Sequence, residues 1–190
     1  MLRISTSFGI CLWLSAMAVS AQDAGQGTKI ELAQGKLSLV VPADWKPVPP
    51  KSSIVEYEFM APKSESKAEM QARVTVMQAG GGVQANVDRW YGQFEQPDKS
   101  STKDKAKVEK FEVAGSTVHF VDISGIYKDS MGGGPFAPKP SVLRTNYRKV
   151  GAIIQLKDSG DFYLTITGPN AVVEKQIASM KKMLQEMKAK

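Results

Sequence analysis

The chain has 190 residues, of which 42% are hydrophobic and 23% are charged, with one cysteine, one histidine and a net charge of +6. This composition is typical of one globular domain, and it excludes a low-complexity chain, a disulfide-rich scaffold and an acidic disordered tail. The positive charge is modest and lysines are interleaved with acids, so we expect a solvated surface and no nucleic-acid partner.

The first 21 residues have the pattern of a secretory signal peptide. Arg3 precedes an apolar run, Ile10–Val19, which is followed by small residues up to Ala21. The run is shorter than the ~20 apolar residues that a membrane span requires. We therefore predict cleavage after Ala21, a flexible leader over residues 22–28, and a single exported domain over residues 29–190, periplasmic or extracellular, with no stable membrane span. Because Cys11 lies in the removed segment, disulfides and thiolate metal sites are excluded from the exported chain.

The exported chain begins with segments that have the period of antiparallel strands. Lys29–Leu32 and Lys36–Val41 predict a hairpin with Gly35 in its turn. Three prolines between residues 47 and 50 end this hairpin, and Trp45 is expected to fold back onto the sheet. Alternating apolar residues then predict a second hairpin from IVEYEFM and RVTVMQ. In its first strand Glu56 and Glu58 should face solvent.

The period changes to that of a helix after three glycines at residues 80–82. Val83, Val87, Trp90 and Phe94 follow helical spacing, so we predict an amphipathic helix that ends before Pro97. A solvent-exposed, lysine-rich loop is expected over residues 97–105.

Strand patterns return after this loop. KVEKFEV and STVHFVDISGIY predict a long hairpin with its turn at Ala114–Gly115. SVLRTNYRKV, AIIQL and DFYLTIT follow as further strands, separated by Gly151 and by the turn at Asp158–Asp161. The last element is an amphipathic helix with Asn170 as its expected N-cap.

His119 is the only histidine, and it bears on every catalytic interpretation. A pair of histidines for a metal is excluded, and with no cysteine in the exported chain we predict no metal and no cofactor. The residue lies within a predicted strand and no nucleophile elbow accompanies it, so a packed or surface histidine is favoured over a catalytic one. No residue is therefore assigned a catalytic role.

The segment KDSMGGGPFAPKP, over residues 128–140, is a Gly/Pro-rich insertion between two strands. No Gly-Lys-Ser/Thr follows it, which excludes a P-loop. Long loops between strands are frequently functional. The candidate binding residues of this loop are Met131, Gly132, Gly133, Gly134 and Phe136.

Arg144 and Arg148 add two candidate binding residues on the next strand. Strict alternation places them on one face with Asn146, and places Tyr147 on the opposite face. With Lys149 they could contact an acidic surface, although a solvated polar face also explains the pattern.

The order of elements resembles the PsbP-like superfamily. The matching features are the apolar strand that runs into Pro42 and Trp45, and DFYLTITG, which leads through Pro169 to the helix over Ala171–Met187. The resemblance covers most of residues 29–190. It implies an α+β fold, an α/β/α sandwich with a mainly antiparallel sheet covered by two amphipathic helices, and a non-catalytic binding or assembly module. No His or carboxylate motif of the family is present in this chain, so only the fold is transferred.

The sequence therefore predicts an exported, non-enzymatic binding module of the cell envelope with a protein or envelope partner. Two alternatives stay open. One is a hydrolase or other enzyme that uses His119 with a loop carboxylate such as Asp129. The other is a carrier of a small ligand whose cleft lies between the sheet and the helix of Trp90.

Overall fold

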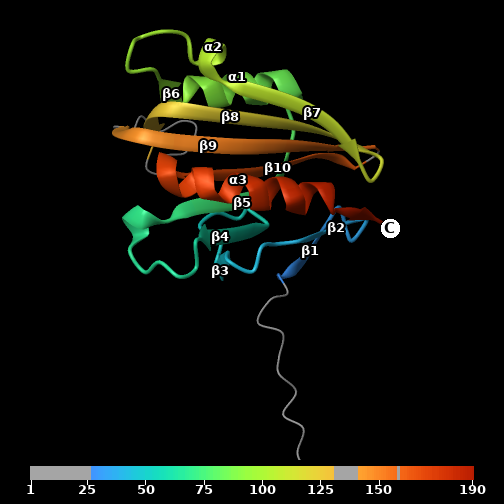
Figure 1. The fold of residues 1–190 in the computed structure, drawn as a ribbon. Coiled ribbons are helices and arrows are strands. Elements are labelled where there is room, and N and C mark those ends of the chain that lie inside the picture. The colour runs from blue at the N-terminus through green and yellow to red at the C-terminus, as the bar shows by residue number, and fades with distance from the viewer. Residues whose placement is uncertain (1–26, 131–140, 158) are drawn as a thin grey trace, which may run out of the picture.

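Two antiparallel sheets and two long helices make up the α+β fold of the computed structural model, which describes residues 27–130, 141–157 and 159–190 (Figure 1). The elements in chain order are β1 (Lys29–Leu32), β2 (Leu37–Val40), β3 (Lys46–Val48), β4 (Tyr57–Ala61), the 3-10 turn η1 (Ala68–Met70), β5 (Ala72–Ala79), α1 (Val83–Gly92), β6 (Phe94–Glu95), α2 (Thr102–Lys105), β7 (Lys107–Val113), β8 (Ser116–Asp129), β9 (Val142–Leu156), β10 (Gly160–Pro169), α3 (Asn170–Gln185) and β11 (Lys188–Ala189).

The main sheet has eight strands in the order β3-β4-β5-β10-β9-β8-β6, and β7 also pairs with β8. Every pairing within it is antiparallel. Figure 1 looks onto the face that α3 covers, and α3 runs in front of β9 and β10. The smaller sheet, β1-β2-β11, contains the predicted first hairpin and flanks α3.

Each face of the main sheet has its own hydrophobic core, because successive side chains of a strand point to opposite faces. On β10, Phe162, Leu164 and Ile166 are buried in the core shared with α3, as predicted. Tyr163 lies between them in sequence and is buried in the second core, with Val87 and Trp90 of α1. The helices thus cover opposite faces, and the predicted antiparallel sheet covered by two amphipathic helices is confirmed.

The predicted return of Trp45 to the sheet is also confirmed. Its indole is 3% exposed and belongs to the α3 core. The Nε1–H donates a hydrogen bond of 2.8 Å to Oε1 of Gln176 on α3. A buried indole N–H needs such a partner, and this one ties the N-terminal part of the chain to the last helix.

Gly151 does not separate two strands, contrary to the prediction. It lies inside β9, which is continuous over 15 residues. A Cβ at this position would be 2.3 Å from Cζ3 of Trp90. The glycine is therefore required by the close approach of the α1 indole to the sheet, and glycine inside a strand is typical of such contacts.

Pro47 lies in β3, at the edge of the sheet, where a missing N–H is tolerated. Two smaller predictions need correction. The loop over residues 97–105 contains the short helix α2, in which Thr102 is buried. Asn170 is the first residue of α3, and Pro169 occupies the N-cap position.

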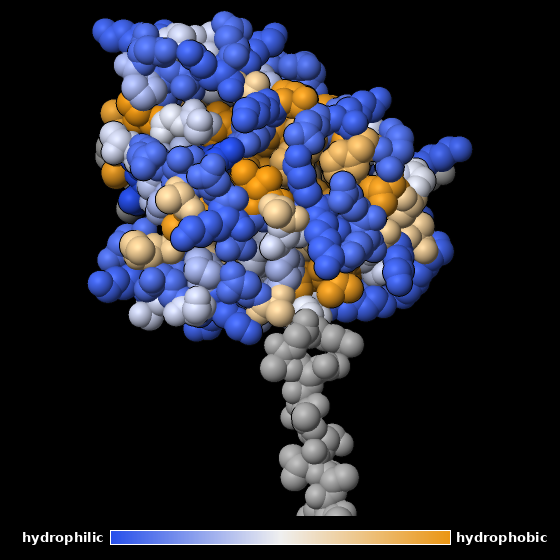
Figure 2. All heavy atoms as spheres, in the orientation of Figure 1, coloured by the Kyte–Doolittle hydropathy of each residue, from blue (hydrophilic) through white to orange (hydrophobic). Residues whose placement is uncertain are grey.

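The predicted signal peptide lies outside the described residues, as does most of the leader. The carbonyl of Thr28, the last residue of the predicted leader, accepts a 2.8 Å hydrogen bond from the Val41 N–H, and β1 begins at the next residue, Lys29. No helix in the described part of the chain is long and apolar enough to cross a membrane. Figure 2 shows that hydrophilic residues dominate the α3 face and that its hydrophobic residues form separate groups.

Candidate functional site

A cleft of about 650 Å³ lies on the α1 face of the main sheet. This volume is within the range of about 300–1,000 Å³ that is usual for small-molecule sites. Its floor is formed by strands β5, β10, β9 and β8. One wall is formed by α1 and Gln93, and the other by the segment around β4 and η1. The lining residues are Lys51, Ile54, Met60, Glu69, Gln71, Arg73, Thr75, Met77, Arg89, Trp90, Gln93, Tyr127, Asp129, Arg144, Tyr147, Lys149, Tyr163, Thr165, Thr167 and Gly168.

The strand register brings polar and cationic side chains together on the cleft floor. Thr167 of β10 is directly opposite Arg73 of β5 on one side and Lys149 of β9 on the other. Directly opposite residues have Cβ atoms about 4.5–5.5 Å apart, so the three side chains form one row across the sheet. In the adjacent row, Thr75 and Thr165 are hydrogen-bonded through their hydroxyls at 2.9 Å.

A bulge in β9 changes which residues face the cleft. Tyr127 is paired with Arg144 and Gly125 with Tyr147, so two residues of β9, Thr145 and Asn146, oppose a single residue of β8. Asn146 has a φ of 54°, a left-handed conformation that asparagine tolerates better than most residues. A bulge re-aims the side chains that follow it.

The prediction that Arg144 and Arg148 share a face is therefore wrong. Arg144, Tyr147 and Lys149 all line the cleft. The Arg144 guanidinium carbon lies 5.8 Å from the centre of the Tyr147 ring. The rings of Tyr127 and Tyr147 are stacked, with centres 6.1 Å apart and planes 4° from parallel. The aromatic surface that was expected on the opposite face from the arginines lies beside Arg144.

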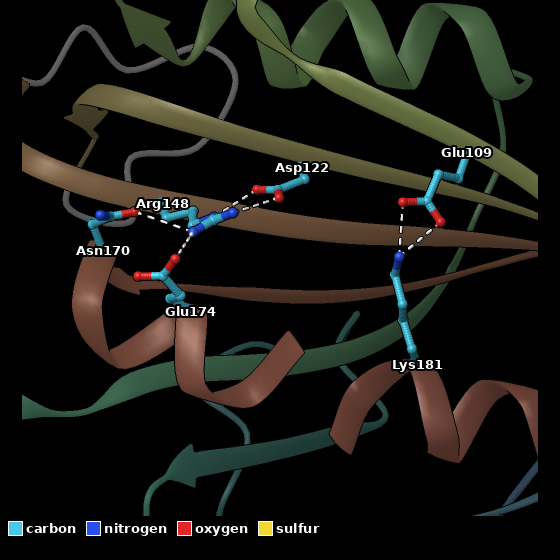
Figure 3. Close-up of polar contacts among 6 residues, drawn as sticks. All are labelled: Glu109, Asp122, Arg148, Asn170, Glu174 and Lys181. Carbon is cyan, nitrogen blue, oxygen red and sulfur yellow. Dashed lines mark hydrogen bonds and ion pairs between the residues drawn. The ribbon is translucent and has the colours of Figure 1, made fainter. Parts of the chain in front are cut away.

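Arg148 lies on the opposite face of the sheet and binds neighbouring side chains there (Figure 3). It donates two hydrogen bonds to the Asp122 carboxylate, at 2.7 and 2.6 Å. It also contacts Glu174 at 3.6 Å and Asn170 at 3.5 Å, both on α3. With 13% of its side chain exposed, Arg148 fixes the start of α3 to the sheet and does not line the cleft.

Glu58 also corrects a prediction, because its carboxylate is buried and does not face solvent. Arg73 donates two hydrogen bonds to it, from Nε at 2.7 Å and from Nη2 at 2.9 Å. The backbone N–H of Lys51 donates a third, at 3.0 Å. The Arg73 hydrogen bond is the main cause that lowers the pKa of Glu58, against the opposing effect of burial. Arg73 is thus a cleft cation whose charge has a fixed partner.

Lys149 is the most unusual residue of the cleft, because it is 6% exposed and has no carboxylate partner among the described residues. Its Nζ donates to Oε1 of Gln93, which follows α1, and lies 5.5 Å from the centre of the Tyr127 ring. Burial lowers its pKa to about 7, and the nearby charges of Arg89 and Arg73 add to this effect. Strongly shifted groups in a cleft are typical of functional sites.

The α1 wall of the cleft is held by a hydrogen-bond network. Asn86 donates from Nδ2 to Oη of Tyr163 at 2.8 Å and to the Gly82 carbonyl at 2.8 Å. Its Oδ1 accepts a 2.8 Å hydrogen bond from Arg89. Trp90 packs edge-on against Tyr163, with ring centres 6.2 Å apart. The position of α1 over the sheet is therefore fixed by buried groups.

The structure does not bring together His119 and Asp129, the two residues of the enzyme alternative. His119 and Asp129 lie ten residues apart on β8. At a rise of about 3.3 Å per residue, this places them roughly 33 Å apart. His119 Nε2 is hydrogen-bonded to Oε1 of Gln155 at 2.9 Å, and Asp129 accepts a 2.7 Å bond from Arg144. Among the described residues, no three or more His, Cys, Asp or Glu side chains gather as in a metal site.

The loop candidates Met131, Gly132, Gly133, Gly134 and Phe136 lie outside the described residues, so nothing tests them. Of the two predicted site residues that the structure describes, Arg144 lines the cleft and Arg148 does not. Lys149 was noted in the sequence only as an addition to the arginines. Arg73, Arg89 and Tyr127 were not singled out, because their convergence depends on strand register and on the bulge.

No family model and no curated protein sequence matches this chain. Similar solved structures exist at low sequence identity. The cyanobacterial PsbP (CyanoP) of Synechocystis sp. PCC 6803 matches with a TM-score of 0.52 and 9% identity, over 96% of this chain and 98% of that one. LpqN of Mycobacterium tuberculosis, described as involved in cell envelope biogenesis, matches with a TM-score of 0.47 and 12% identity, over 85% of this chain and 88% of LpqN. The match to CyanoP shows that the chain has a PsbP-like fold.

Proposed function

We propose that this protein is an exported, non-catalytic binding module that holds a small molecule in the cleft on the α1 face. The observation that carries the proposal is the cleft itself, with a volume of about 650 Å³ and walls that include Trp90, Tyr127 and Tyr147. Aromatic walls with a few convergent polar groups are typical of small-ligand sites. The signal-peptide pattern of the first 21 residues supports export.

The chemistry of the lining residues favours binding over catalysis. In the described part of the chain the cleft contains no histidine, cysteine or serine, so a His-activated nucleophile is not available in it. The hydroxyls of Thr75 and Thr165 bond to each other. Asp129 is paired with Arg144. The fold class, for which the sequence resemblance implies a binding or assembly role, is consistent with this choice.

Fluorescent probes test this proposal directly. 1-Anilinonaphthalene-8-sulfonate and N-phenyl-1-naphthylamine have the same aromatic skeleton, and both become fluorescent in apolar sites. Thr167→Trp places a large side chain on the cleft floor, and we expect it to weaken the binding of at least one probe about tenfold or more. The matched variant Thr117→Trp lies on β8 outside the cleft and should leave the affinity unchanged. Failure of both probes to bind the full chain, or equal binding by Thr167→Trp, would contradict the proposal.

A further inference from the structure

The charges of the cleft are only partly compensated. Five cationic residues line it, against the two acids Glu69 and Asp129. Arg73 is paired with Glu58, and Arg144 with Asp129. The remaining cations include two whose polar partners, among the described residues, are neutral amides.

Lys149 and Arg89 are these two cations. Lys149 donates to Gln93, and Arg89 donates to Asn86. An amide oxygen satisfies an N–H group but leaves the positive charge in place. Burying an unpaired ammonium is costly, and natural proteins retain such groups chiefly where an anion or another partner can pair with them. Lys149 and Arg89 therefore form a cationic site that can bind a negatively charged group.

The aromatic rings of Tyr127 and Tyr147 lie next to this cationic site. The Tyr127 ring lies beside Lys149 and is stacked on Tyr147, and both rings line the cleft. Because both rings line the cleft, a planar or apolar group held in it can pack against them. Met77 on β5 adds another apolar side chain to the floor of the cleft.

We propose that the ligand is a soluble organic anion whose negative group binds Lys149 and Arg89 and whose planar or apolar body packs against Tyr127 and Tyr147. This inference rests on the proposed function and names the chemical class of its ligand. The carboxylate, sulfonate or phosphate of the ligand pairs with these two cations, which makes the cleft selective for anions over neutral molecules of the same shape.

The two probes named above separate this inference from the proposed function, because they differ by one sulfonate group. Lys149→Met keeps an unbranched apolar side chain that is one atom shorter, and it removes the charge. We expect it to weaken the binding of 1-anilinonaphthalene-8-sulfonate about tenfold to a hundredfold, the range of a lost charge-assisted hydrogen bond. The affinity for neutral N-phenyl-1-naphthylamine should stay within about twofold, because packing against the rings is retained.

Lys181→Met is the matched control. Lys181 also lies over an aromatic ring, 4.9 Å from the centre of Phe120, but it is on α3 at the opposite face. Its replacement should leave both affinities unchanged. Arg89→Gln provides a second test that does not depend on the folding of a core variant, because Arg89 is exposed. It should weaken the sulfonate probe about threefold or more and leave the neutral probe unchanged.

The outcomes are distinct. Loss of the sulfonate probe alone in Lys149→Met and Arg89→Gln supports the anion site. If both probes bind in the cleft and neither variant discriminates between them, the anion inference is overturned while the proposed function stands. If Thr167→Trp displaces neither probe, the cleft is not a binding site and both proposals fail.

Discussion

Replacement of Gly151 by alanine should destabilise the protein, because the Trp90 indole occupies the space that the new methyl group needs. A Cβ at residue 151 would lie 2.3 Å from Cζ3, 2.6 Å from Cη2 and 2.9 Å from Cε3 of that ring. The ring is 2% exposed and packs against Tyr163, so it has little room to move away. Overpacking of this kind costs about 1–3 kcal/mol, which exceeds the ~0.5–1 kcal/mol that alanine gains over glycine inside a strand.

The assay is urea unfolding followed by far-ultraviolet circular dichroism. In a Trp90→Leu background, Gly151→Ala should be neutral or stabilising, which gives a coupling free energy of about 1–3 kcal/mol in the double-mutant cycle. Gly80→Ala is the control, because a Cβ there meets no atom within 4 Å. An unchanged free energy of unfolding for Gly151→Ala, or the same loss in both backgrounds, would refute the assignment of Trp90 to this position.

Four further predictions concern charged and polar groups. Glu58→Gln should lower the free energy of unfolding by about 1.5–3 kcal/mol at pH 7. The pKa of Glu58 is lowered from 4.5 in the folded protein, so the ionised carboxylate stabilises the fold above pH 4.5 and this stabilisation is lost as the pH falls further. The free energy of unfolding should therefore decline less with acid in the variant than in the wild type. Lys149→Met should raise the free energy of unfolding by about 1–3 kcal/mol at pH 6, where the wild-type lysine is buried with its charge. The pKa of Lys149 is about 7 in the folded protein and 10.5 in the unfolded chain, so the unfolded state binds more protons between these two pH values. The free energy of unfolding of the wild type should therefore rise with pH across this window. The variant should show no such rise. Arg148→Ala should lower the free energy of unfolding by about 1.5–3 kcal/mol and leave the affinity for the sulfonate probe unchanged. Arg144→Ala should weaken that affinity, because Arg144 lines the cleft. The reverse pattern would contradict the placement of the two arginines on opposite faces of the sheet. His119→Ala should lower the free energy of unfolding by about 0.5–1.5 kcal/mol, the value of one hydrogen bond, without changing the affinity for either probe. A large loss of probe affinity would contradict the placement of His119 outside the cleft.

Strand and helix periodicity was sufficient to predict most of the fold. The alternation of Phe162, Leu164 and Ile166 placed β10 correctly, and the helical spacing of Val83, Val87 and Trp90 placed α1. These patterns are local and depend only on the side-chain period of each element. The resemblance to PsbP-like proteins then supplied the arrangement of the elements, which the structure bears out at the level of the fold.

The candidate site depended on features that periodicity does not contain. The left-handed Asn146 shifts the alternation of β9 by one residue, so Arg144 and Arg148 diverge and Tyr147 joins Arg144. Glu58 was assigned to solvent because Arg73 lies on another strand, and nothing local indicates their pairing. Convergence of this kind depends on register between distant segments, which a single sequence does not specify.

We propose that an organic anion binds beside Lys149 on the α1 face of the main sheet. A crystal structure of the full chain in complex with 1-anilinonaphthalene-8-sulfonate would locate that anion. We expect the sulfonate within hydrogen-bond distance of Lys149 Nζ and the naphthalene ring against Tyr127 and Tyr147. A probe bound on the α3 face, or bound in the cleft with its sulfonate turned away from Lys149 and Arg89, would contradict the claim.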